Sequence, residues 1–119
     1  MTSTVEQIVY WHRELPPIDA EILGEYTVDA TSRHVPGTIA HRDELWRLCY
    51  EDLMMRTRTR LEQEVARLGG HYAHVFDESI DVRRDEAKGE AWLGGRFSYV
   101  LYRRPLNRAV AQGSAGREP

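Results

Sequence analysis

The sequence predicts an α+β domain of two layers, in which one long helix packs on a small, mostly antiparallel sheet. Three observations predict it: a long amphipathic pattern in the middle of the chain, two segments with strand character after it, and one alternating segment before it. A helix of this length in a chain of 119 residues must form a whole layer, because it crosses a small sheet completely. The expected order is a β-α-β-β plan with an extra N-terminal strand.

The first part of the chain contains two strand candidates with a proline break between them. The segment from Val5 to Trp11 is rich in β-branched and aromatic residues, which is typical of a short strand. Pro16 and Pro17 end it, because proline lacks the backbone N–H that a sheet requires. The segment GEYTVDATS at 24–32 alternates apolar and polar residues, which predicts a second strand with one buried face.

The amphipathic pattern runs from Arg42 to Gly70 and predicts one long helix. The positions of its mostly apolar stripe recur every three or four residues, at Trp46, Cys49, Leu53, Thr57, Leu61, Val65 and Leu68. This period, close to 3.6, indicates a surface helix with a broad buried face. The pair Gly69 and Gly70 predicts a left-handed cap at its C-terminal end.

Two strands after the helix predict a hairpin. The segments from His71 to Val82 and from Ala91 to Tyr102 have strand composition, and a polar turn separates them. Glycines 94 and 95 inside the second segment predict a bulge or a close approach of another group to the backbone. The chain then divides into an N-terminal strand and arm at 1–19, the α+β domain at 20–104 and a flexible tail at 105–119.

Composition narrows the class of protein. Hydrophobic residues make up 41% and charged residues 29%, as in ordinary globular domains. The formal net charge of −3 disfavours nucleic acid as a partner. Cys49 is the only cysteine, which excludes an internal disulfide and a CxxC motif. No segment has the apolar length of a membrane span and the N-terminus lacks the pattern of a secretory signal, so we expect a cytoplasmic protein without a membrane partner.

The predicted sheet has two apolar faces, and one helix can cover only one of them. Strand alternation places Ala73 and Val75 on one face and, on the other, Tyr72, Phe76, Ile80 and Val82. Either the aromatic residues of the N-terminal strand, Tyr10 and Trp11, fold over this second face, or another copy of the chain covers it. We expect a homo-oligomer whose interface includes Tyr72, Phe76, Val100 and Tyr102.

Four segments of the chain resemble the YbjQ-like family of heavy-metal-binding domains, which shares the β-α-β-β plan of the dodecin-like folds. They are GEYTVDATS at 24–32, RLEQEVARLGG at 60–70, HYAHVFDESI at 71–80 and LGGRFSYVLY at 93–102. The resemblance covers roughly residues 20–103 and implies a closed ring, commonly a pentamer, in which sheets meet between subunits. The chain departs from the family at 71–74 and 97–99, where bulky residues replace small ones.

The histidines are candidates for transition-metal ligands. His71 and His74 have an HxxH spacing, but residues i and i+3 of a strand point to opposite faces and cannot chelate one ion. A metal site would need further ligands, such as His34, His41 or Cys49, or residues of a neighbouring subunit. A metal-binding module with His34, His71 and His74 at a subunit junction is therefore one alternative, and surface or interface histidines are the other.

Two further groups are candidates for a ligand site or for catalysis. Three residues could stack on a flat ligand or pack at an interface: Trp11, His12 and Trp92. A small enzyme could use His12 or His74 as acid or base with the carboxylates of Asp77 and Glu78. The same acidic cluster is also typical of a solvated turn, and the sequence leaves both interpretations open.

The remaining candidates favour structure over chemistry. The arginines at 56, 58 and 60 spread around the helix, and each has an acidic residue four positions away, in the pairs Asp52–Arg56, Arg58–Glu62 and Arg60–Glu64. These pairs cancel the positive field that phosphate binding requires. Cys49 belongs to the apolar stripe. We therefore expect a non-enzymatic, homo-oligomeric binding or assembly domain of YbjQ-like type, with the metal module and the small enzyme as alternatives.

Overall fold

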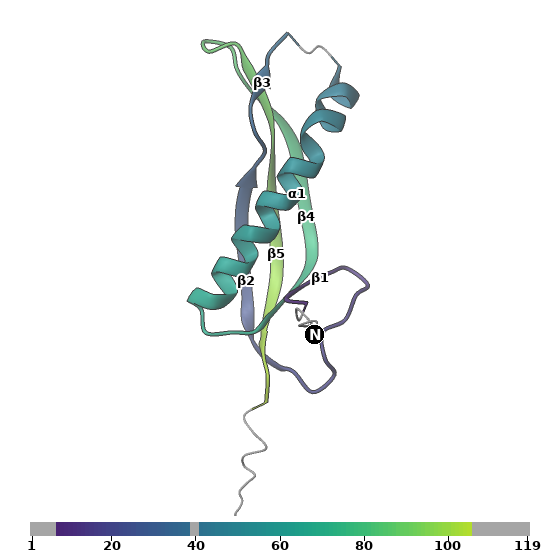
Figure 1. The fold of residues 1–119 in the computed structure, drawn as a ribbon, viewed down its shortest axis with the longest axis vertical. Helices are drawn as coiled ribbons and strands as arrows, with labels where there is room; N and C mark the ends of the chain where they lie inside the picture. Colours follow the sequence, from purple (N-terminus) through teal and green to yellow (C-terminus); the bar gives the residue numbers. More distant parts are fainter. Residues whose placement is uncertain (1–6, 39–40, 106–119) are drawn as a thin grey trace, which may run out of the picture.

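The computed structural model describes residues 7–38 and 41–105 and shows an α+β fold, as predicted (Figure 1). Its elements follow in the order β1 (Val9–Trp11), β2 (Glu21–Thr31), β3 (Val35–Pro36), α1 (Arg42–Arg67), β4 (Tyr72–Asp85) and β5 (Glu90–Arg103). The strands form one mixed sheet, and α1 runs along one of its faces. All but the first residue of the predicted tail at 105–119, and the start of the predicted N-terminal strand, lie outside the described residues.

The sheet is built around the β4–β5 hairpin, whose two strands pair antiparallel along their whole length. β2 and the short β3 pair antiparallel with the other side of β5. The extra N-terminal strand β1 pairs parallel with the beginning of β4, from Ala73 to Val75. The strand order β1-β4-β5-β2 therefore gives a mostly antiparallel sheet with one parallel pair, and β1 and β2 lie at its edges.

The apolar stripe of α1 packs on the sheet as the sequence predicts. Its buried side chains are Leu45, Cys49, Leu53, Thr57, Leu61 and Val65. The Thr57 hydroxyl donates a hydrogen bond of 2.8 Å to the Leu53 carbonyl, which satisfies this polar group inside the core. The Cys49 thiol is buried and lies 3.8 Å from the Arg33 carbonyl, so the cysteine acts as a core residue.

The glycine pair ends α1 and turns the chain into β4. Gly69 has a φ of 78°, the left-handed conformation that glycine adopts without a Cβ clash. Its N–H donates to the Ala66 carbonyl, and the N–H of Gly70 donates to the Val65 carbonyl. This pair of hydrogen bonds is the Schellman arrangement, which satisfies carbonyls that the last helical turn leaves open. The predicted left-handed cap is confirmed.

Two of the three predicted helix ion pairs are present. Arg56 pairs with Asp52 at 3.0 Å, and Arg58 pairs with Glu62 at 3.4 Å. Glu64 makes its direct contact with Arg67, whose Nε and Nη2 donate to its carboxylate at 3.1 and 2.6 Å, while the charge of Arg60 acts on it without an ion pair at contact distance. The planar guanidinium meets both carboxylate oxygens in this geometry, which is a stronger contact than a single hydrogen bond. These hydrogen bonds lower the pKa of Glu64.

A β-bulge in β4 overturns the predicted division of its residues between the two faces. The register with β5 shifts between Val75 and Asp77, so Phe76 is an extra residue and the alternation changes there. Ala73 and Val75 face α1 before the bulge, whereas Ile80 and Val82 face it after the bulge, opposite the core-facing positions 95 and 93 of β5. The sequence had placed Ile80 and Val82 on the far face with Phe76.

The far face of the sheet is consequently polar along its middle. Asp29 pairs with Arg96 across β2 and β5 at 3.0 Å, and Arg83 pairs with Asp81 on β4 at 3.1 Å. Tyr10 and Tyr72 lie at one end of this face, with their rings edge-on and the centroids 6.0 Å apart. β1 thus extends the sheet at its edge: Tyr10 lies on the far face, whereas Trp11 lies on the α1 face with its ring edge-on to Phe97. The predicted cover of the far face by both residues is not formed.

The glycines in the middle of β5 give the close approach that was one of two predicted outcomes. The β4–β5 register continues without a shift through Gly94 and Gly95. The Arg83 side chain crosses Gly94 so closely that a Cβ there would overlap the guanidinium.

The helix of the described ranges, 7–38 and 41–105, is not apolar enough along its length to cross a membrane.

Candidate functional site

The outer edge of β4 is open to pairing with another strand over most of its length. β1 pairs with this edge only as far as Val75, where the His12 N–H donates to the Val75 carbonyl at 2.8 Å. From Phe76 to Asp85 no strand among the described residues pairs with it. An edge of this kind presents unpaired N–H and C=O groups and acts as a template for another strand.

The hydrogen bonds on the far side of β5 show which β4 groups point outward. Ser32 donates its N–H to the Leu93 carbonyl at 2.8 Å, and the Leu93 N–H donates to the Ser32 hydroxyl at 3.0 Å. The backbone groups of Leu93 therefore point away from β4. Val82 lies opposite Leu93, and residues of such an antiparallel pair both turn their backbone groups outward. By alternation the N–H and C=O groups of 78, 80, 82 and 84 face the open edge.

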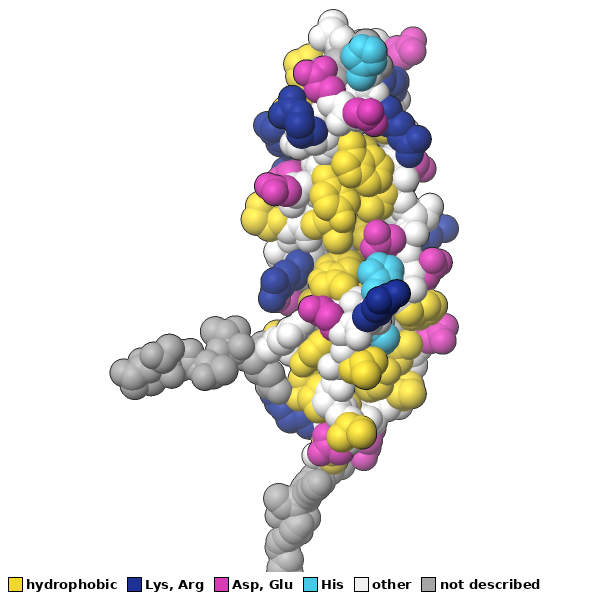
Figure 2. Space-filling model, turned by 90° about the vertical axis from the view of Figure 1, so that its right-hand side faces the viewer, with side chains coloured by type: hydrophobic (Ala, Val, Ile, Leu, Met, Phe, Trp, Pro, Cys, Tyr) yellow, Lys and Arg dark blue, Asp and Glu magenta, His cyan; other side chains and the backbone are white. Residues whose placement is uncertain are grey.

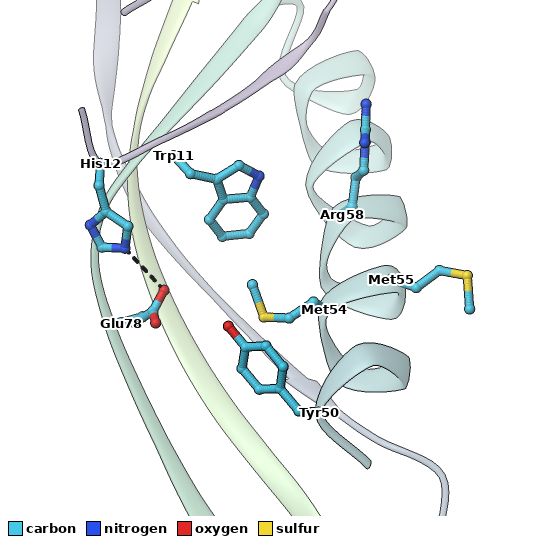
Figure 3. A pocket seen from close by; sticks show the side chains of 7 residues that line it. All are labelled: Trp11, His12, Tyr50, Met54, Met55, Arg58 and Glu78. Carbon is cyan, nitrogen blue, oxygen red and sulfur yellow. Dashed lines mark hydrogen bonds and ion pairs between the residues drawn. The ribbon is translucent and has the colours of Figure 1, made fainter. Parts of the chain in front are cut away.

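A groove lies between this edge and α1, and we call it the β4 groove. It has a volume of about 450 Å³ and is lined by Trp11, His12, Tyr50, Met54, Met55, Arg58 and Glu78. Figure 3 shows Tyr50 and Met54 extending from α1 toward the Trp11 ring, with His12 and Glu78 on the opposite wall. Met55 and Arg58 point away from the centre of the groove. The groove therefore has an apolar floor and a polar rim.

The apolar lining continues along α1 beyond the groove. The Trp46 ring stacks on Tyr50 with centroids 5.5 Å apart and planes 14° from parallel. Ile80 and Val82, half-buried, pack against the core from β4. Figure 2 shows hydrophobic side chains gathered along this side of the molecule between charged ones. A continuous apolar strip of this kind typically marks an interaction surface.

The rim of the groove contains the histidine–carboxylate pair that the sequence proposed for catalysis. His12 has a φ of 52°, which turns the chain away from the sheet and aims its ring at β4. Its Nε2 lies 3.2 Å from Glu78 Oε1, and its carbonyl accepts a hydrogen bond of 2.6 Å from His74 Nε2. His74 therefore donates to the backbone of His12. The His12–Glu78 pair lies at the surface, and the Cys49 thiol is buried in the core and does not line the groove.

The three histidines predicted as metal ligands do not meet within one chain. His34 stacks on Trp92 at 4.0 Å and hydrogen-bonds Glu90, near the hairpin turn. His74 lies opposite Val100, which is about 26 Å from Trp92 at about 3.3 Å per strand residue. His71 accepts a hydrogen bond from the Arg104 N–H through Nδ1. Nowhere in the described ranges do three His, Cys, Asp or Glu side chains form a group suited to a metal ion.

The other predicted site residues also separate. Trp92 lies at the His34 end of the sheet and not with Trp11 and His12. Of the predicted interface residues, Tyr72 is only 2% exposed because its own chain covers it, whereas Phe76 at the bulge is 43% exposed. Val100 and Tyr102 are half-buried. Phe76 is therefore the member of this set that is most accessible to a partner.

The sequence interpretation missed the helical wall of the groove. Tyr50 and Met54 flank the buried stripe of α1 on the side that faces β4, and they line the groove with Met55 and Arg58. The sequence does contain a signal for this wall. Apolar residues beside the buried stripe make the apolar face of the helix wider than contact with one face of a sheet requires. No such signal in the sequence indicates the position of β1. This position leaves the rest of the β4 edge open beside the helical wall.

Comparison with known proteins adds no relative: no family model, no curated protein and no solved structure matches the chain. The resemblance to the YbjQ-like family therefore stays a prediction. The function of the chain has to be argued from the open edge of β4 and the β4 groove.

Proposed function

We propose that this chain is an assembly domain, a non-enzymatic module that associates with copies of itself through an edge of its sheet. The observation that supports the proposal is the unpaired edge of β4 from Phe76 to Asp85, with the apolar β4 groove beside it. Strand addition at such an edge gains main-chain hydrogen bonds, and neighbouring pockets take up side chains. A homo-oligomer in the cytoplasm, as expected from the sequence, is part of this proposal.

The chemistry of the groove favours binding over catalysis. Its floor is aromatic and thioether in character, from Trp11, Tyr50 and Met54, and such side chains dominate the buried centres of interfaces. The exposed His12–Glu78 pair lies in contact with water, where charges interact weakly. The metal-binding alternative would need ligands from more than one chain, since His34 and His74 lie at opposite ends of the sheet.

The test is the mass of the untagged chain in solution, measured by light scattering and sedimentation velocity over a wide range of concentration. The proposal expects species of at least twice the 13.8 kDa chain mass, with the fraction rising with concentration. A monomer at every concentration up to the millimolar range would contradict it.

Matched variants on α1 tie the association to the groove. Met54→Lys places a charge in the apolar floor and should weaken association about tenfold or more, because an unpaired charge cannot be buried without a large cost. Glu51→Lys changes an exposed position three residues away and serves as the control. Equal association of the two variants would show that the groove takes no part in the contact.

A further inference from the structure

We infer that two copies of the chain join β4 edge to β4 edge, antiparallel, about a twofold axis at Ile80, so that Asp77 of each copy faces Arg83 of the partner subunit. This inference rests on the proposed assembly function and names its interface. It follows from three properties of β4: where its edge is open, which of its backbone groups point outward, and how its charges are ordered.

The open edge of β4, rather than that of β2, carries the apolar surroundings. β2 ends the sheet on the other side, where two apolar side chains four positions apart are exposed, Ile22 and Tyr26. The exposed ion pairs of Asp29 with Arg96 and of Glu21 with Arg103 bind β2 to β5 and keep that side polar. The β4 edge instead borders the groove and the stacked rings of Trp46 and Tyr50. Burying the strip beside β4 therefore gains more hydrophobic free energy.

Backbone geometry limits the possible registers. In an antiparallel pair, residues that turn their N–H and C=O groups toward the partner must lie opposite residues that do the same. The outward residues of β4 are those at 78, 80, 82 and 84. A twofold axis perpendicular to the sheet also keeps residues of one face opposite residues of that face. Both conditions allow Ile80 to lie opposite 78, 80, 82 or 84 of the partner subunit, and they exclude odd-numbered positions.

Charge order selects one register from this set. With Ile80 opposite itself, Asp77 faces Arg83 of the partner subunit twice, and Ser79 faces the partner's Asp81. With Ile80 opposite Val82, the two Asp81 side chains face each other and Asp77 faces the partner's Asp85. With Ile80 opposite Glu78, Asp77 faces the partner's Asp81 on both sides. Like charges directly opposite destabilise a strand pair, whereas opposite charges stabilise it.

The length of the open edge fits the same register. The paired segment would run from 76 to 84 in both copies. It ends there because, in each copy, β1 already covers the β4 edge up to Val75. Pairing Ile80 with Arg84 would also place unlike charges together, Asp81 with Arg83. It would, however, shorten the paired segment and leave the outward groups of Glu78 facing the hairpin turn.

The twofold arrangement also brings the β4 grooves of the two copies together. Both helices lie on the same face of one continuous sheet, and adjacent strands are about 4.8 Å apart. The β4 grooves of the two copies then face each other across the shared β4 pair, with Tyr50 and Met54 of each copy lining a common cleft. The apolar strip seen in Figure 2 becomes the centre of the interface.

Charge exchange tests the pairing of Asp77 with Arg83. Asp77→Arg and Arg83→Asp each bring two pairs of like charges together in a homodimer, so each variant alone should dimerise about tenfold more weakly than the natural chain. An equimolar mixture of the two should associate again, because unlike charges then face each other at both places. Arg96→Asp is the control: it breaks an ion pair on the same face, with Asp29, away from the β4 edge.

A label distance tests the register even if a charge variant fails to fold. A nitroxide on Glu86→Cys, in the hairpin turn, should lie about 40 Å from its counterpart, since each label is six residues from the axis at Ile80, on opposite sides of it, and strand residues rise about 3.3 Å. Cys49 is buried and does not compete for the label. A dimer with another distance, or a mixture that does not associate, overturns this inference and leaves the assembly function standing. A monomer overturns both.

Discussion

At the scale of single residues, Gly69 joins the end of α1 to the start of β4. Its φ of 78° lies in the left-handed region, and a Cβ placed there would meet no other atom within 4 Å. The cost of another residue at this position is therefore purely conformational. The Schellman hydrogen bonds to Ala66 and Val65 depend on this conformation, so the strain cannot relax without opening the cap.

We predict that Gly69→Ala lowers the free energy of unfolding by about 1 kcal/mol, because alanine adopts the left-handed conformation at that cost. Gly69→Asn should lose less, since asparagine tolerates this region better than alanine. Urea unfolding followed by circular dichroism measures both. Equal stability of the alanine variant and the natural chain would show that the cap is not formed as described.

Tyr99 makes stability sensitive to alkaline pH. Its side chain is fully buried on the α1 face of β5, and this burial raises its pKa above 10.0. A group whose pKa is raised in the folded chain contributes stability below its unfolded pKa, and this contribution is lost as the pH rises above it. Burial raises the pKa of Tyr72 in the same direction.

The expected outcome is that stability falls as the pH rises past about 10, and that it falls less steeply in Tyr99→Phe, which has no phenol to ionise. Urea unfolding at a series of pH values between neutrality and the alkaline range measures the slope. Comparison of each chain with itself at neutral pH removes the effect of the lost hydroxyl. Identical slopes for the two chains would contradict the burial of Tyr99.

At the scale of elements, α1 provides the layer that makes the sheet stable. Its residues 53 and 55 are close in sequence and differ in environment: Leu53 is fully buried, whereas Met55 is 64% exposed. Leu53→Ala leaves a cavity beneath the helix and should cost about 2–5 kcal/mol of unfolding free energy. Met55→Ala should change stability by less than about 0.5 kcal/mol. Similar losses in both would mean that α1 faces the sheet with a different side.

The elements were predictable where a periodic pattern is unbroken. The spacing of Cys49, Leu53 and Leu61 reports a helix because each position faces the same layer, and the glycines after it report the cap. The alternation in β4 was not a safe guide, since the bulge at Phe76 inserts a residue without a compositional mark. Ile80 and Val82, which follow the bulge, were therefore assigned to the wrong face.

The candidate site was predictable only in part. Trp11 and His12 were selected from the sequence and do line the groove, but Trp92 was grouped with them and lies at the other end of the sheet. The residue pattern along one strand shows which face of the sheet a residue occupies. It does not show which residues distant in the sequence that residue contacts. The parallel pairing of β1 with β4 brings Trp11 opposite Tyr50 and Met54, and no local signal in the sequence encodes that pairing.

At the scale of the whole molecule, the short β1 leaves most of one edge of the sheet open. β1 covers β4 only as far as Val75, and the turn at His12 leads the chain away. The rest of β4 keeps its edge groups, and α1 supplies an apolar strip beside them. Charges of both signs on β4 would repel most strand additions and accept one that matches their order, which gives the edge specificity.

Amide hydrogen exchange of the natural chain at low and high concentration tests whether chains assemble through the β4 edge. We predict that the outward amides at 78, 80 and 82 become protected as concentration rises. The outward amides of β2, at 27 and 29, should exchange rapidly at both concentrations. Rapid exchange at Ile80 and Val82 in a sample that is dimeric by mass would contradict the claim.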